Sequence, residues 1–250
     1  MAANKMRVIT RYFEGADLTP AQLLEMSNLR RSVMGMKPET DLAQDFAGFC
    51  EFCQSCFLIA LFCDPDGKVV GTTCYAAQRG TTPAGQRYLL IVPDYSFMLP
   101  EYRGHPAYVH AILRMGLRLL RLWRGEQIWF GSVAYPSAML LYEEMFAQVY
   151  LCGDPDLPPV AHLMLDWMLQ NVAGSRWDAQ AGCINMPTIP PVMSDKWLAN
   201  AELRPMYQRY IVKCPDWRNG YALAGVARMN LLGMFLAGLR KLQRRSGRRA

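Results

Sequence analysis

Two apolar runs separated by a tight turn form the clearest pattern in the first half of the chain. Residues 56–63 (CFLIALFC) are continuously apolar, residues 64–67 (DPDG) form a strong turn signal, and residues 68–77 (KVVGTTCYAA) are again mostly apolar. This pattern predicts two buried antiparallel strands joined by a hairpin. After a loop rich in Gly, Pro and Thr, residues 87–99 predict a third extended stretch, kinked at Pro93.

Helical spacing of apolar positions flanks these strands on both sides. In chain order, the sequence predicts a strand at 6–11, helices at 20–34 and 41–55, the three extended stretches, a long helix at 107–124, a strand at 126–133 and a helix at 137–146. Antiparallel strands followed by a strand–helix–strand crossover predict an α/β fold. We expect a mixed, mostly antiparallel sheet of about seven strands, with helices on its faces.

The last hundred residues follow a less regular pattern. The sequence predicts a break at 155–159, a helix at 160–168, a Pro-rich loop at 187–191, a strand at 207–214 (YQRYIVKC) and an amphipathic helix from about residue 231 with a basic end. We therefore expect a core over residues 1–153, an extension over 154–229 that completes the sheet or forms a lid, and an amphipathic helix with a basic tail over 230–250.

Charge and hydropathy narrow the class of protein. No apolar run reaches the length of about 18 residues that a membrane-spanning helix needs, and the N-terminus lacks a signal-peptide core. A cytoplasmic location is expected. The net charge of +6 is concentrated at the end of the chain, because residues 240–250 contain six cations. The rest is close to neutral, so nucleic-acid binding by the body of the protein is not indicated.

Eight cysteines in a cytoplasmic chain of this length do not indicate a disulfide scaffold. Cys50, Cys53 and Cys56 have the C-x-x-C-x-x-C spacing of a metal or iron–sulfur site, but a fourth ligand is missing nearby. The alternative is that they belong to the apolar stripe of the helix at 41–55, where a free cysteine acts as a small apolar side chain. The second interpretation is favoured, and no metal site is predicted.

Residues 97–146 carry the chemistry that the sequence suggests. A strand ends in Pro100-Glu101-Tyr102-Arg103-Gly104, a long helix follows at once, then a strand, then a short helix that contains Tyr142. The first turn of a helix offers unpaired N–H groups and a positive dipole, which suit a phosphate group. A tyrosine on the next helix can protonate a leaving thiolate. The order of these features suits a thioester donor.

These residues resemble the GCN5-related N-acetyltransferase (GNAT) superfamily. In that superfamily a strand ends in P-E-Y-R-G, the next helix opens with R-x-x-G-x-G/A, and a later helix carries N-P-x-A-x-x-L-Y. Here Pro100–Gly104 matches the first motif, and Tyr135–Tyr142 (YPSAMLLY) matches the last in all but its first position. The resemblance is close over about fifty residues and follows the order of elements over residues 6–150.

The resemblance implies an acyltransferase and the roles of several residues. It implies that Tyr142 is the general acid, and that the donor contacts Met98, Leu99, Arg103, Gly104, His105, Ala107, Tyr108 and Tyr135. Asp94 and Glu101 flank the end of the strand before the donor helix, where some members of the superfamily keep their general base. No cofactor is expected to stay bound; acyl-coenzyme A or acyl-phosphopantetheine would be a co-substrate.

Two glycine positions of the phosphate-binding motif are occupied by Pro106 and Tyr108. Proline lacks an N–H donor, and tyrosine adds bulk where a pyrophosphate would approach the backbone. Two explanations stay open: the site has degenerated, or it accepts a donor with a single phosphate, carried by an acyl carrier protein.

A stripe of arginines bears on the donor. Arg114, Arg118, Arg121 and Arg124 recur at helical spacing. Such a stripe could attract an acidic acyl carrier protein, or it could simply be the solvated face of an amphipathic helix. The layout resembles long-chain N-acyl amino acid synthases and acyl-homoserine lactone synthases, which use such carriers.

The sequence thus predicts an N-acyltransferase that transfers an acyl group to a primary amine, of an amino acid or another small molecule. The alternative is a non-catalytic protein of the same fold that binds a partner or a membrane surface. Residues 230–250 suit either a helix lying on the inner face of an anionic membrane or a helix docked on the domain.

Overall fold

The computed structural model describes residues 7–229. Within this range the α-helices are α1 (Pro20–Val33), α2 (Leu42–Ser55), α3 (Ala107–Leu122), α4 (Pro136–Met145), α5 (Pro159–Met168), α6 (Asp195–Glu202) and α7 (Pro205–Lys213). The strands are β1 (Ile9–Phe13), β2 (Gly35–Met36), β3 (Leu58–Cys63), β4 (Val69–Thr81), β5 (Arg87–Met98), β6 (Gln127–Ala134), β7 (Val149–Leu151), β8 (Trp177–Asp178), β9 (Cys183–Asn185), β10 (Thr188–Ile189) and β11 (Tyr221–Arg228).

One large mixed sheet organises the molecule. Its strand order is β1-β3-β4-β5-β6-β11-β9-β8, and β7 also pairs with β11. Every pairing in it is antiparallel except that of β5 with β6. The predicted fold class, a mostly antiparallel sheet flanked by helices, is therefore confirmed.

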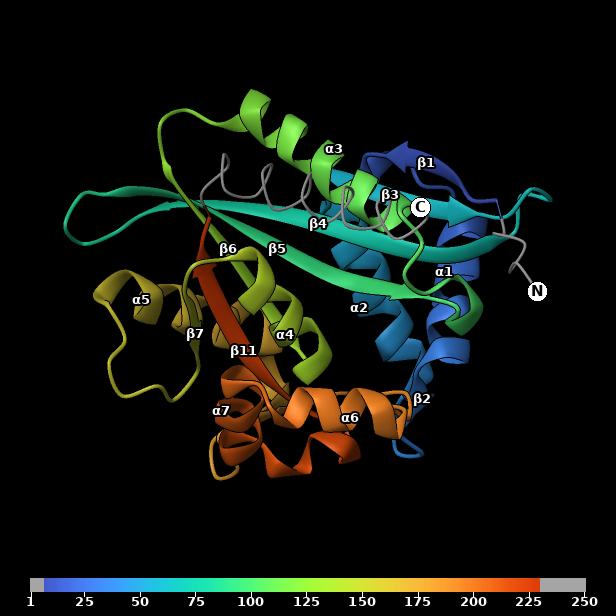
Figure 1. Cartoon of the computed structure of the whole chain (residues 1–250). Coiled ribbons are helices and arrows are strands. Elements are labelled where there is room, and N and C mark those ends of the chain that lie inside the picture. The colour runs from blue at the N-terminus through green and yellow to red at the C-terminus, as the bar shows by residue number, and fades with distance from the viewer. Residues whose placement is uncertain (1–6, 230–250) are drawn as a thin grey trace, which may run out of the picture.

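The parallel pair β5 and β6 separates along its length. The two strands are paired only from Tyr88 opposite Gln127 to Ile91 opposite Phe130. Beyond that point β5 stays paired with β4, whereas β6 stays paired with β11. Figure 1 shows the result, with β4 and β5 running to one side and β6 and β11 to the other from a common end.

Local signals explain why the predicted helices form. Thr19 accepts from the N–H of Gln22, and the Gln22 side chain accepts from the N–H of Thr19, so a capping box opens α1, with Pro20 at its first position. Asp41 accepts from two N–H groups at the start of α2. These contacts satisfy donors that a helix terminus would otherwise leave unpaired.

The predicted strand at 207–214 is wrong, because this segment forms α7. Pro205 begins the helix, and Met206, Tyr207 and Tyr210 are buried at helical spacing, while Val212 is exposed. The β-branched and aromatic residues suggested a strand, but packing on a 3.6-residue period determined the outcome.

The sheet is also larger than the seven strands expected. Nine strands between residues 7 and 229 belong to it, because the C-terminal extension contributes β8, β9 and β11. The sequence pattern did not reveal β11, whose residues (YALAGVAR) include three alanines and one glycine. Residues 154–229 therefore complete the sheet, although the predicted domain boundary near 153 stays a prediction.

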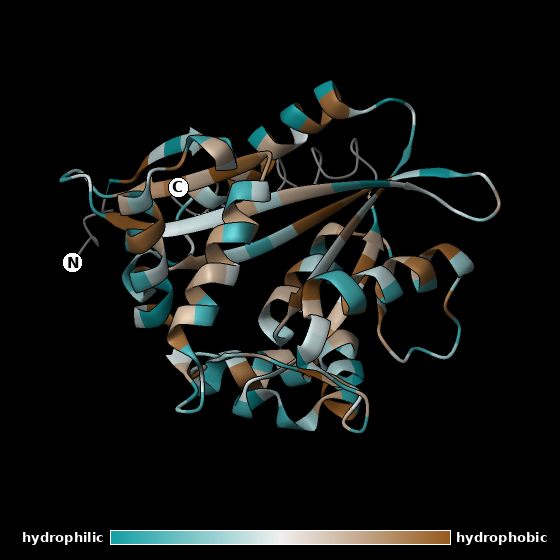
Figure 2. Cartoon of the chain, turned by 180° about the vertical axis from the view of Figure 1, so that it is seen from behind, coloured by the Kyte–Doolittle hydropathy of each residue, from teal (hydrophilic) through white to brown (hydrophobic). Residues whose placement is uncertain are grey.

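The central strands are buried, including all six residues of β3 and the first seven of β4. Figure 2 shows hydrophobic and hydrophilic residues alternating along the helices around them. The tip of the β4–β5 hairpin extends beyond the sheet and is mainly polar in the same view. None of the helices within residues 7–229 is long and apolar enough to cross a membrane. The predicted amphipathic helix at 230–250 lies outside the described residues.

Candidate functional site

A cavity of about 1370 Å³ occupies the gap between the separating strands. Residues Pro93–Met98 of β5 form one wall, and Phe130 and Ser132–Ala134 of β6 form another. The start of α3, the helix α4 and the segment 186–193 close the remaining sides. The separation of one parallel strand pair therefore creates a large, partly open cavity.

A β-bulge shapes β5 where it borders this cavity. Thr72 of β4 lies opposite Phe97, but Cys74 lies opposite Asp94, so β5 carries one extra residue. Tyr95 in the bulge has a φ of +47°, which is unfavourable for a residue with a Cβ. Its ring packs edge-on against Phe49, at 4.7 Å between centroids, which helps to hold this conformation.

Asp94 lies at this bulge and lines the cavity. Its carboxylate accepts a hydrogen bond of 2.7 Å from the N–H of Tyr95. Burial raises the pKa of Asp94 to about 6, against the opposing effects of that N–H and of the guanidinium groups of Arg176 and Arg30. A carboxylate with this pKa is ionised at neutral pH and can still accept a proton.

Tyr142 faces the same cavity from α4. Its ring packs at right angles to that of Phe130, at 5.1 Å, and it also contacts Phe146. Burial raises the pKa of the Tyr142 hydroxyl well above its usual range, and hydrogen bonding with Ser132 only partly offsets this effect. The hydroxyl therefore keeps its proton at neutral pH and is available as a proton donor.

Most of the residues expected to contact a donor do line the cavity; they are Met98, Arg103, Gly104, His105, Tyr108 and Tyr135. Tyr135 donates a hydrogen bond of 2.5 Å to the carbonyl of Thr188. Leu99 and Ala107 lie outside the cavity lining: the N–H of Leu99 bonds to the carbonyl of Val70, and Ala107 is buried beside β3.

The backbone N–H groups at the start of α3 are largely engaged within the turn. The N–H of Ala107 bonds to Nδ1 of His105 at 3.1 Å, and the N–H of Tyr108 bonds to the carbonyl of His105. Pro106 has no N–H to offer. The first turn of α3 therefore has fewer free donors for a phosphate group than an open helix N-terminus.

Glu101 does not share the cavity with Asp94 and Tyr142. It is exposed in the short 3-10 turn Pro100–Tyr102, between β5 and α3. Of the two carboxylates considered as a general base, only Asp94 lines the cavity.

The predicted arginine stripe on α3 is partly engaged with β1 and its neighbourhood. Arg118 forms an ion pair with Glu14 at 3.0 Å, and the guanidinium of Arg114 lies 5.6 Å from the ring centroid of Tyr12. Arg121 and Arg124 are exposed.

The cysteines at the end of α2 are free thiols in an apolar cluster. Cys53 and Cys56 are buried and belong to the same apolar cluster as Cys74 of β4. In the part of the chain that the structure describes, no group of three potential ligands has the arrangement of a metal site.

Three arginines that were not expected from the sequence also line the cavity: Arg30, Arg176 and Arg204. Arg30 carried a signal, because it shares a helical face with the buried residues Leu23, Met26 and Ser27. A charged residue at such a position is unusual unless it is paired. Arg176 follows a π-helical turn in a segment without a clear pattern, so its sequence gave no comparable signal.

No protein-family model matches this chain, and no curated protein matches it. Solved structures with a similar fold include a GNAT-family N-acetyltransferase from Escherichia coli in complex with CoA, with 15% identity and a TM-score of 0.38 over 57% of this chain and 71% of that one. A predicted acetyltransferase from Clostridium acetobutylicum with acetyl-CoA has 11% identity and a TM-score of 0.45 over 62% and 97% of the two chains. An acetyltransferase from Trypanosoma brucei has 16% identity and a TM-score of 0.40 over 61% and 98%.

Proposed function

We propose that this protein is an N-acyltransferase that moves an acyl group from a pantetheine thioester to a primary amine. The observation that carries the proposal is the cavity between β5 and β6, into which Asp94 and Tyr142 both project. One residue can accept a proton at neutral pH and the other can donate one. Aminolysis of a thioester needs both transfers.

The proposed reaction begins with attack of the amine nitrogen on the thioester carbonyl carbon. A C–N bond forms, and Asp94 accepts the proton that the nitrogen loses. The C–S bond then breaks, and the hydroxyl of Tyr142 gives its proton to the sulfur. The products are an amide and a free pantetheine thiol. Beyond Ile91, β5 is no longer paired with β6, so backbone N–H groups on that edge of β5 would polarise the carbonyl.

The donor is acyl-coenzyme A or acyl-phosphopantetheine on a carrier protein, and we favour the carrier protein. The turn before α3 has few free N–H groups for a pyrophosphate, since His105 engages two of them. A carrier-bound donor presents one phosphate and needs fewer donors. Arg114, Arg118 and Arg121 on the adjacent helix would contact the acidic carrier. The product would be an N-acyl amine such as an N-acyl amino acid.

A non-catalytic role remains the second candidate, and the same turn is the observation that favours it. Pro106 and Tyr108 stand where a coenzyme-A site would need small residues with accessible backbone. In that case the cavity would serve binding, and residues 230–250 would contact a partner or the inner face of a membrane.

Mass spectrometry of lipid extracts separates the two candidates. Cells that express the full chain are compared with cells that express a Tyr142→Phe variant, after immunoblotting confirms equal amounts of protein. The proposal predicts new N-acylated amines that are strongly reduced in the variant. If the N-acylated amines are the same in cells with and without the wild-type chain, that result would contradict transfer of long acyl chains and favour the binding role.

A further inference from the structure

Arg176 is held rigidly at the edge of the cavity. Its Nε donates to the carbonyl of Ala173 at 3.2 Å, and Nη2 donates to the carbonyl of Val172. These two bonds fix the plane of the guanidinium group. Among residues 7–229, the third nitrogen, Nη1, has only the thioether sulfur of Met186 as an acceptor, at 3.9 Å. Sulfur is a weak acceptor, so this nitrogen keeps most of its capacity to donate.

The charge of Arg176 is also uncompensated by direct contact. Within residues 7–229, Arg176 forms no ion pair. Arg204, which also lines the cavity, is paired with Glu143 and Glu144 instead. A half-buried guanidinium without a carboxylate partner is a suitable binding group for an anion.

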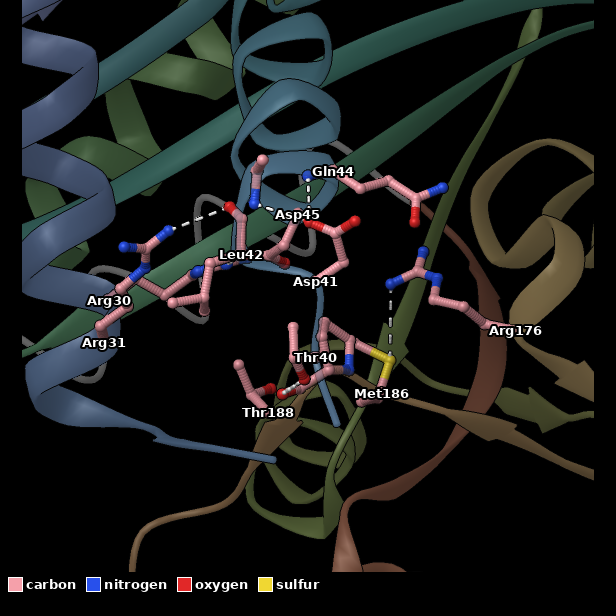
Figure 3. Close-up of polar contacts among 12 residues, drawn as sticks. Arg30, Arg31, Thr40, Asp41, Leu42, Gln44, Asp45, Arg176, Met186 and Thr188 are labelled. Carbon is pink, nitrogen blue, oxygen red and sulfur yellow. Dashed lines mark hydrogen bonds and ion pairs between the residues drawn. The ribbon is translucent and has the colours of Figure 1, made fainter. Parts of the chain in front are cut away.

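Arg30 also lines the cavity and acts on the carboxylate of Asp94 in the same direction as Arg176. Its side chain is only 5% exposed and is paired with Asp45. Its buried Nε has no hydrogen-bond partner in the described part of the chain. Figure 3 shows Arg176 extending toward Met186 and toward Gln44 at the start of α2, with Arg30 on α1 on the other side of the gap.

Asp94 lies close enough to both arginines for each to affect its carboxylate. The cavity therefore presents a negative group beside positive ones. An amino acid carries the complementary charges, an ammonium group and a carboxylate separated by one carbon atom. A simple amine would satisfy Asp94 but leave Arg176 without a partner.

We infer that Arg176 binds the carboxylate of the acceptor, and that the acceptor is therefore an amino acid. This inference rests on the proposed function for its reaction. It adds the substrate class and a specificity-determining residue, and its binding component can be tested without catalysis.

The test compares amino acids that have a primary amino group and no side-chain carboxylate with the amine that α-decarboxylation gives, for example L-phenylalanine with 2-phenylethylamine. Transfer from dodecanoyl-coenzyme A and from a dodecanoyl carrier protein is measured with the full chain, with Arg176→Gln and Arg176→Lys, and with Arg218→Gln as a control for the loss of an exposed arginine outside the cavity. Saturation-transfer NMR measures binding of the same compounds in the absence of any donor.

The inference predicts that the wild-type enzyme acylates the preferred amino acid about 10²-fold or more faster than the matching amine at low concentration. In Arg176→Gln, the KM for the amino acid rises and this preference is lost, while kcat/KM for the amine changes little. Arg176→Lys keeps part of the preference, and Arg218→Gln keeps all of it. A wild-type enzyme that uses amines as well as amino acids would overturn the inference, whether or not the variants fold.

The binding measurement separates failure of the inference from failure of the proposed function. If no compound is acylated but amino acids bind the wild-type chain and not Arg176→Gln, the carboxylate site stands and the transfer proposal fails. If transfer occurs but Arg176→Gln slows amino acid and amine equally, the transfer proposal stands and Arg176 has only a structural role. If no amino acid binds or reacts, the inference fails.

Discussion

At position 94, burial and neighbouring charges act in opposite directions on one carboxylate. Burial raises its pKa from 3.8 to about 6, and the guanidinium groups of Arg176 and Arg30 limit the shift. The bulge at Tyr95 places the carboxylate in the cavity and gives it one backbone donor. Strain in the bulge and the cost of burying a charge are features that proteins commonly retain at functional sites.

The pH dependence of transfer tests the role of Asp94. If Asp94 accepts the proton of the amine, kcat/KM rises with pH through an apparent pKa of about 6, because only the ionised carboxylate is active. Asp94→Asn lowers kcat/KM by on the order of 10²-fold and removes this limb from the profile. Steady-state rates between about pH 5 and pH 8 check both effects. A variant that keeps the limb would show that another group titrates there.

The same substitution has a predictable effect on stability. Because the pKa of Asp94 is raised in the folded state, its contribution to stability is complete below about pH 4 and is lost as the pH rises through about 6. A rise of the pKa from 3.8 to about 6 corresponds to about 3 kcal/mol, so Asp94→Asn should raise the melting temperature by on the order of 5–10 °C near pH 8 and have little effect near pH 4. Calorimetric scans at the two pH values provide the measurement. An equal change at both would contradict the cause assigned to the shift.

Tyr142→Phe tests the proton donor. The ring contacts with Phe130 and Phe146 do not involve the hydroxyl, so the variant keeps its packing. We expect kcat to fall by on the order of 10²-fold, with little change in the KM for the amine. A thioester donor with a more acidic leaving thiol should recover part of the lost rate, because its thiolate needs less protonation. A variant with normal kcat would exclude Tyr142 as the general acid.

At the level of elements, Glu126 holds the closed end of the separating strand pair. Its side chain is 1% exposed and pairs with Arg79 of β4 and Arg87 of β5, and it accepts from the N–H of Arg124. Burial raises its pKa, but these donors lower it more, to about 2. The carboxylate thus links β4 and β5 to the start of β6 at the paired end of the two strands, away from the gap.

Glu126→Gln should lower the melting temperature at neutral pH, because it removes the charge that pairs with two arginines. Since the pKa of Glu126 is lowered in the folded state, the difference from the wild-type chain should narrow as the pH falls from about 4.5 toward 2. Thermal unfolding across this pH range measures the difference in melting temperature, and Glu51→Gln, at an exposed position, serves as the control. A difference that does not depend on pH would contradict this account.

The arginine surface of α3 makes a separate prediction about the donor. Arg114→Glu combined with Arg121→Glu should reduce kcat/KM for a carrier-protein donor by about tenfold or more, mainly through slower association, and leave coenzyme-A donors nearly unaffected. Salt screens these charges, so the difference in kcat/KM between the wild-type chain and the double variant should shrink as salt is added. Arg218→Glu serves as the control. Equal effects on both donors would show that this surface does not recognise a carrier.

At the level of the whole molecule, the extension and the core share one sheet. β11 pairs with β6 over six residues and lies between it and β9. A chain that ends after Gly153 would expose the unpaired edge of β6 and the apolar side chains that pack against the extension. We expect it to be insoluble or to form large aggregates in size-exclusion chromatography, whereas a chain that ends at Met229 stays monodisperse. A soluble, folded 1–153 fragment would show that the extension is a separate unit.

The sequence predicted the parts of the fold that have local signals. The capped helices α1 and α2, the β3–β4 hairpin and the α3–β6–α4 succession were all expected from periodicity and turn residues. The small residues of β11 and the aromatic residues of α7 did not indicate the correct secondary structure, because contacts with residues distant in sequence determine it in both segments. Tyr142 was expected from its motif and Asp94 from its place near the end of a strand, and both line the cavity. Arg176 was not expected, because its place depends on the packing of the extension.

The most direct test of the central claim is a transfer assay with the purified full chain. Dodecanoyl-coenzyme A and a dodecanoyl carrier protein are each incubated with a mixture of amino acids and amines, and amide products are quantified by mass spectrometry for the wild-type chain, Asp94→Asn and Tyr142→Phe. We predict an N-dodecanoyl product with the wild-type chain from at least one donor and a reduction on the order of 10²-fold in each variant. No amide from either donor, or equal amounts from all three chains, would contradict catalysis by these two residues in the cavity between β5 and β6.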